Sequence, residues 1–119
     1  MKVKGIVEKG AGKGTPEFVP TINLLLSDVP AGLEFGVYTC KTAVEGVWYG
    51  GALHYGPRTS VDNLITFEVN LFEFDKQIYG QEVEVEILQK IREIVKFDSH
   101  ESLKSQILKD IEQAKLNLK

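Results

Sequence analysis

Apolar and polar residues alternate along most of this chain, with breaks rich in glycine, proline and polar residues. Alternation with a period of two is typical of strands that bury one face. Two of the alternating runs are separated only by Glu45-Gly46, which predicts a tight antiparallel hairpin. We therefore expect six strands, at residues 1–8, 24–26, 35–44, 47–55, 64–74 and 82–91.

The last segment has a different period. Apolar residues recur there at steps of three or four, which predicts a helix with one apolar face: Leu103, Ile107, Ile111, Ala114 and Leu118. Asp98 is suited to cap this helix, and Glu101 three residues later completes a pair that resembles a capping box. We expect the apolar face to close one side of the sheet.

Six closely spaced strands followed by one helix indicate a mainly β fold, a small antiparallel barrel. A parallel sheet would need crossover helices between the strands, and the pattern predicts none. A chain of 119 residues is long enough to bury one core without disulfides. We expect residues 1–119 to form a single domain.

Composition limits the partners. A net charge of −3 and a pI near 5.4 offer no basic stripe to a nucleic acid, so we expect none. The sequence contains no long apolar run that would predict a membrane segment. The single Cys40 rules out an internal disulfide, as suits a cytoplasmic protein. The expected form is a monomer in the cytoplasm.

The stretch Gly10–Asn23 is the first candidate for chemistry. Its alternating glycines, with Lys13 between them, suit a backbone nest that binds phosphate. If the exit is extended, Thr21 and Asn23 point to the same face. A hydroxyl and an amide oxygen together are ligands that Mg²⁺ accepts beside a phosphate. The alternative is a flexible hairpin loop in which Pro20 opens a strand.

Glu68 is the second candidate. It lies in a strand whose other face is an apolar row, so Glu68 and Asn70 should both point away from the core. Phosphoryl transfer needs phosphate donors, a metal and a base for the attacking hydroxyl, and Glu68 would be that base. The alternative is an ordinary surface carboxylate. The two histidines, His54 and His100, do not form a metal-site pattern.

In combination, these motifs resemble the riboflavin kinase family over nearly the whole chain. The matching elements, in order, are Gly10-x-Gly12-x-Gly14, Pro20-Thr21-x-Asn23, Glu68, Tyr79-Gly80, Arg92 and Lys96-Phe97. The resemblance implies a six-stranded antiparallel Greek-key barrel with a C-terminal helix. It also implies the reaction of ATP with riboflavin to give FMN and ADP, with Mg²⁺.

The resemblance assigns roles to nine residues. Glu68 would be the base that acts on the ribityl 5′-hydroxyl, and Thr21 and Asn23 would hold Mg²⁺ and contact ATP. The remaining residues would bind ATP (Gly10, Gly12, Gly14, Tyr79) or flavin (Arg92, Phe97).

The chain also departs from the family pattern. Phe18-Val19 stands where the family usually has a glycine and a hydrophobic residue, and Glu93 replaces a proline found in many relatives. These departures keep a second hypothesis open, a non-catalytic barrel that binds flavin or nucleotide. A third is a structural barrel with no small ligand.

Overall fold

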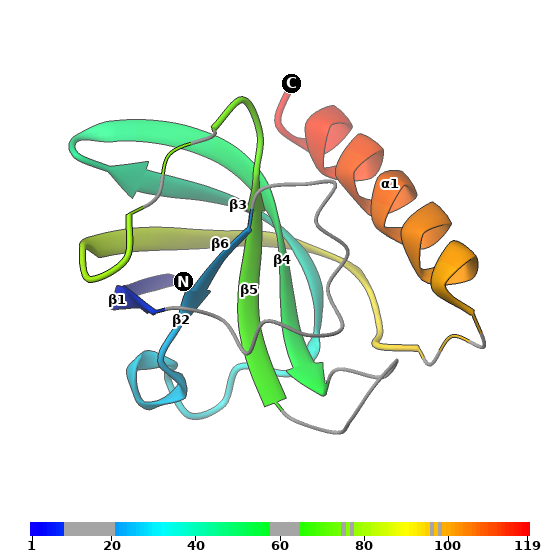
Figure 1. The fold of residues 1–119 in the computed structure, drawn as a ribbon, viewed down its shortest axis with the longest axis horizontal. Coiled ribbons are helices and arrows are strands. Elements are labelled where there is room, and N and C mark those ends of the chain that lie inside the picture. The colour runs from blue at the N-terminus through cyan, green and yellow to red at the C-terminus, as the bar shows by residue number, and fades with distance from the viewer. Residues whose placement is uncertain (9–20, 58–64, 75, 77, 96, 98) are drawn as a thin grey trace.

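In the computed structural model, strands form a closed barrel and a helix lies along its outside (Figure 1). The structure describes residues 1–8, 21–57, 65–74, 76, 78–95, 97 and 99–119. The elements of this part are β1 (Lys2–Glu8), β2 (Thr21–Leu24), the 3-10 helix η1 (Leu26–Asp28), β3 (Gly36–Val44), β4 (Val47–Pro57), β5 (Ile65–Leu71), β6 (Glu82–Arg92) and α1 (His100–Asn117).

The strands follow the order β1-β2-β5-β4-β3-β6 around the barrel, and each neighbouring pair is antiparallel. Within this order, β3, β4 and β5 are successive neighbours, and β6 returns to lie beside β3. That arrangement is a Greek key. The predicted fold class, a six-stranded antiparallel Greek-key barrel with a C-terminal helix, is confirmed.

The barrel interior is filled by the apolar residues of the alternating pattern. In β1, for example, every second residue is buried, and β5 buries its apolar row while Glu68 and Asn70 lie on the outer face. The core residues come from all six strands and the turn after β5: Val3, Val7, Ile22, Leu24, Tyr38, Cys40, Val44, Leu53, Phe67, Val69, Leu71, Phe74, Ile78, Val83, Val85 and Ile87.

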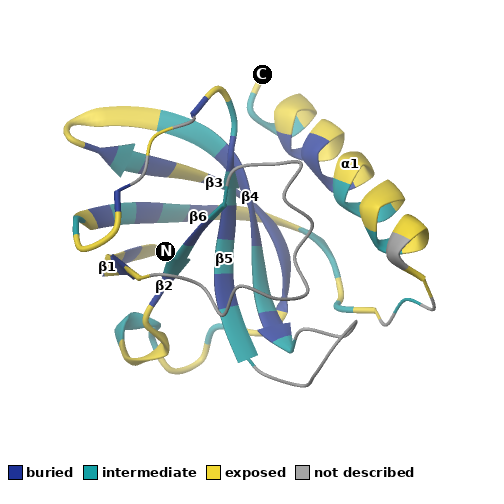
Figure 2. Cartoon of the chain, viewed as in Figure 1, coloured by how far each residue is buried: buried dark blue, intermediate teal, exposed yellow. Residues whose placement is uncertain are grey.

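Strand β3 is buried on both faces along residues 36–40 (Figure 2). The cause is α1, which packs on β3, β4 and β6. Ile111 and Ala114 of the helix are buried, and Asn117 Nδ2 donates to Thr39 Oγ1 at 2.8 Å. The expectation that the apolar helix face closes one side of the sheet is therefore confirmed.

The β3–β4 hairpin is also confirmed. Glu45 and Gly46 have φ values of 50° and 82°, which is the conformation that a two-residue hairpin turn requires. Val44 pairs with Val47 directly across that turn.

The strand predicted at residues 24–26 was wrong in position. The strand is Thr21–Leu24, where Leu24 pairs with Val7 of β1 and Thr21 pairs with Asn70 of β5. A strand buries only alternate residues, so the run of three leucines cannot all face the core. Leu25 and Leu26 are instead 40% and 44% exposed, and the chain turns into η1.

The predicted helix cap was also wrong. Ser99 is the N-cap, and its Oγ accepts a hydrogen bond from the backbone N–H of Ser102. Asp98 lies outside the described residues, and Glu101 falls one position too early for a capping box that starts at Ser99.

A methyl group at Gly51 should destabilise the barrel. A Cβ there would lie 2.7 Å from the backbone oxygen of Asn70. We expect Gly51→Ala to lower the free energy of unfolding by about 1–3 kcal/mol, because a backbone atom cannot yield easily. Gly50→Ala is the matched control, since its Cβ would meet side-chain atoms alone, the flexible end of Leu118 at 2.7 Å and the ring of Phe72 at 3.4 Å. Urea unfolding of both variants tests this, and equal losses would contradict it.

Candidate active site

Polar side chains form a row across three neighbouring strands on the outer face of the barrel. Asn23 of β2 lies directly opposite Glu68 of β5, and Glu68 lies directly opposite His54 of β4. Thr21 pairs with Asn70 one step further along. Directly opposed residues of an antiparallel pair point to the same face, with Cβ atoms about 5 Å apart. The barrel therefore brings the two predicted metal ligands and the predicted base together.

Alternation within each strand explains this placement. In β2, Ile22 and Leu24 are buried in the core, so Thr21 and Asn23 face outward and are half-buried. In β5, Phe67 and Val69 are buried and Glu68 between them faces outward. The expectation that Thr21 and Asn23 share a face is confirmed.

Tyr79 lies near the C-terminal end of β1. The backbone N–H of Gly80 donates to the carbonyl of Val7 at 2.7 Å, which ties this turn to the end of β1. Tyr79 itself is 52% exposed. Gly10, Gly12 and Gly14 lie outside the described residues.

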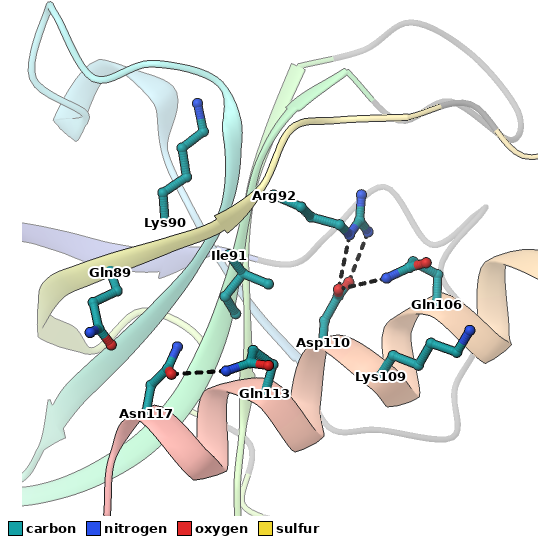
Figure 3. Close-up of a pocket in the computed structure, with 9 residues that line it drawn as sticks. All are labelled: Gln89, Lys90, Ile91, Arg92, Gln106, Lys109, Asp110, Gln113 and Asn117. Carbon is teal, nitrogen blue, oxygen red and sulfur yellow. Dashed lines mark hydrogen bonds and ion pairs between the residues drawn. The ribbon is translucent and has the colours of Figure 1, made fainter.

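Arg92, at the end of β6, forms a forked ion pair with Asp110 of α1 (Figure 3). Its Nε donates to Asp110 Oδ1 at 2.9 Å and its Nη2 donates to Asp110 Oδ2 at 2.8 Å. Gln106 Nε2 also donates to Asp110 Oδ1, at 3.0 Å. The guanidinium carbon lies 5.8 Å from the ring centre of Phe97. The two residues assigned to flavin are thus neighbours, and Asp110 fixes the guanidinium.

A polar cavity of about 440 Å³ lies between β6 and α1. Of the predicted site residues that the structure describes, Arg92 alone lines it, together with Asp110 and Gln106 beside the ion pair (Figure 3). Thr21, Asn23, Glu68 and Tyr79 lie elsewhere. The structure therefore places Thr21, Asn23 and Glu68 in one group and Arg92 and Phe97 in another.

Sequence reasoning gave no role to Asp110 and His54. A signal for Asp110 was available, because it falls on the apolar face of the helix, one position before Ile111. A carboxylate on a buried face is rarely found without a partner. His54 carried no such signal, because its neighbours in space come from strands that are distant in sequence.

His54 is held neutral. Burial, and secondarily the charge of Arg92, lower the pKa of its imidazole to about 4. Glu68 of β5 lies directly opposite His54, and the charge of Asp110 on α1 acts against the lowering of this pKa. Its Nδ1 is buried and has no hydrogen-bond partner within the described residues.

This lowered pKa predicts acid destabilisation. Between pH 6.5 and about 4 the unfolded chain protonates His54 while the folded chain does not, so the unfolded state binds more protons. The contribution of His54 to the free energy of unfolding is therefore complete above pH 6.5. It falls as the pH drops to 4, by about 3 kcal/mol at most. Urea unfolding at pH 7 and pH 4.5 measures it. In His54→Phe the free energy of unfolding should decrease less between pH 7 and pH 4.5 than in the wild type, and His100→Gln is the control. An unchanged drop in His54→Phe would contradict the prediction.

Among the described residues, no cluster of three or more His, Cys, Asp or Glu side chains is placed to hold a metal ion. Within the same residues, no helix is both long and apolar enough to span a bilayer.

This chain is similar to known proteins over nearly its whole length. It is 39% identical over 116 residues to the bifunctional riboflavin kinase/FMN adenylyltransferase of Haemophilus influenzae. That match covers 96% of this chain and 37% of the relative, so this chain spans little more than a third of the relative's length.

The crystal structures that are similar to this one include the following two. A protein from Streptococcus pneumoniae described as a macrolide-efflux protein superposes with a TM-score of 0.78 at 33% identity, over 92% of this chain and 36% of that one. The riboflavin kinase of Trypanosoma brucei superposes with a TM-score of 0.62 at 21% identity, over 98% and 78%, and shares the fold. The family model for riboflavin kinase (flavokinase) matches residues 1–118. This chain therefore belongs to the riboflavin kinase family.

Proposed function

We propose that this chain transfers the γ-phosphate of ATP to the 5′-hydroxyl of riboflavin, giving FMN and ADP. The observation that carries the proposal is the position of Glu68, which lies opposite Asn23 on the same outer face as Thr21. A base and two oxygen ligands on one face are the parts that phosphoryl transfer requires beside a phosphate loop. ATP is the phosphate donor of this family.

Glu68 is proposed to take the proton of the ribityl 5′-hydroxyl as that oxygen attacks the γ-phosphorus. The strand fixes the face from which the Glu68 side chain leaves, because Phe67 and Val69 on either side are buried in the core. A base held in this way gains from orientation as well as from proton transfer.

Thr21 and Asn23 would hold Mg²⁺, which neutralises phosphate charge when bound. Their neutral oxygens fit this ion, which usually keeps several waters and binds through few protein groups plus phosphates. Gly10, Gly12, Gly14 and Tyr79 are proposed to contact ATP, and Arg92 and Phe97 to contact the flavin ring. The position of Tyr79, at the end of β1, supports its assignment to the nucleotide side.

Removing the hydroxyl of Thr21 should weaken the metal site. We expect Thr21→Ala to raise the Mg²⁺ concentration for half-maximal rate by about ten-fold or more, because even an outer partner of a metal site contributes that much. Titration of the rate with MgCl₂ measures the change. Thr21→Ser keeps the hydroxyl and should stay close to wild type. An unchanged metal dependence in Thr21→Ala would remove this residue from the ligand set.

The experiment that tests the proposal is FMN formation from riboflavin, ATP and MgCl₂, followed by chromatography. The main alternative is a barrel that binds flavin or nucleotide without catalysis, which the replacement of a family glycine at Phe18-Val19 favours. FMN production supports the kinase. Quenching of riboflavin fluorescence with no FMN would support the binding barrel. The absence of both quenching and FMN would favour a structural role.

We further propose that residues 1–119 act as one domain and a monomer in the cytoplasm, without nucleic-acid or membrane partners. The acidic composition and the single cysteine support this. Light scattering of the purified chain tests the monomer.

A further inference from the structure

His54 lies between the two groups of site residues. Four register pairs place Asn23, Glu68, His54, Val37 and Arg92 in one row across β2, β5, β4, β3 and β6. Strands are spaced by about 4.8 Å, so Glu68 and Arg92 are roughly 14 Å apart along the curved sheet. His54 is one strand from Glu68 and two strands from Arg92.

His54 lies between Glu68 and Arg92 in this row, and it has an unpaired buried polar atom. Its Nδ1 is buried and has no hydrogen-bond partner in the part of the chain that the structure describes. A buried polar atom in this state costs about 1–3 kcal/mol and needs an explanation. The residue as a whole is partly exposed, and the χ2 torsion of histidine is broad, so rotation of the ring can turn the nitrogen toward a ligand.

Val37, the neighbour of His54 on β3, has no polar side-chain atom to offer a ligand. Val37 pairs with both His54 and Arg92, and it is buried under α1. A neutral imidazole has one hydrogen-bond donor and one acceptor, and His54 is held neutral by burial. That combination suits an alcohol, which also donates and accepts, and it suits an anion poorly.

We infer that His54 is a specificity-determining residue that hydrogen-bonds a secondary hydroxyl of the ribityl chain. The inference rests on the proposed function, in which Glu68 acts at the 5′-hydroxyl and Arg92 and Phe97 hold the ring. A polyol chain that leaves Glu68 in the direction of Arg92 meets His54 first, one strand away. The imidazole then selects a flavin with a hydroxylated side chain over one with an alkyl side chain.

The test compares two flavins. Riboflavin carries the ribityl chain, and lumiflavin has the same ring with only a methyl group in its place. Dissociation constants are measured by flavin fluorescence quenching, with ADP and MgCl₂ present, for wild type, His54→Phe and His54→Asn. Thermal unfolding shows whether each variant is folded.

We expect His54→Phe to weaken riboflavin binding by about ten-fold and to change lumiflavin binding by less than about two-fold. His54→Asn keeps a donor and an acceptor and should recover most of the riboflavin affinity. If His54→Phe fails to fold, His54→Asn and His54→Leu make the same comparison.

Two results would overturn the inference alone: unchanged riboflavin binding in the folded His54→Phe or His54→Leu variant, or equal weakening of both flavins. Wild-type protein that binds neither flavin would instead overturn the proposed function on which the inference depends.

Discussion

Glu68→Gln is expected to lower the rate of FMN formation by about 10²–10⁴-fold while riboflavin binding stays close to wild type. Glutamine keeps the shape of the side chain and removes its ability to accept a proton, and a positioned general base contributes a factor of this size. The core residues on either side of Glu68 are unchanged, so the strand should keep its register.

Single-turnover rates and riboflavin titrations of the same preparations separate the two effects. Glu73→Gln is the matched control, because it makes the same chemical change at an exposed acid just after the same strand. Its rate should be unchanged. A rate near wild type in Glu68→Gln, or an equal loss of binding and rate, would show that Glu68 is not the base.

Asp110→Ala is expected to lower the free energy of unfolding by about 3 kcal/mol, because it leaves the largely buried cation of Arg92 without its partner. The side chains of Asp110 and Arg92 are 6% and 18% exposed, so water replaces the lost contacts poorly. Gln106 loses its acceptor as well. Urea unfolding at pH 7 measures the effect.

The double variant Arg92→Met/Asp110→Leu serves as the control for this pair. It removes both charges and fills a similar volume, so it should be more stable than Asp110→Ala. A loss below about 1 kcal/mol in Asp110→Ala would mean that the ion pair behaves like an exposed one. Riboflavin should also bind more weakly to Asp110→Ala, since the guanidinium is no longer held beside Phe97.

Local patterns were enough to predict much of this fold. Alternation placed the face of Glu68, and Glu45-Gly46 predicted the hairpin, because both depend on residues adjacent in sequence. The error at Leu24–Leu26 has a different origin. Pairing of β2 with β1 and β5 ends the strand at Leu24, and that pairing involves segments far away in the chain.

The candidate site was predictable in part for the same reason. Thr21 and Asn23 share a face through their own spacing, but their position opposite Glu68 depends on the register of two strands. The partner of Arg92 comes from the C-terminal helix, and His54 joins the row only through the barrel order. The two neighbours of Glu68 could not be derived without knowing that order.

The most direct test of the central claim is a single-turnover transfer of the γ-phosphate from labelled ATP. The protein, in excess, is mixed with ATP, MgCl₂ and either riboflavin or 5′-deoxyriboflavin, which lacks the accepting hydroxyl. We expect the label to appear in FMN with riboflavin and in no flavin with the deoxy compound. Riboflavin that binds but stays unlabelled, or a labelled deoxy compound, would contradict it.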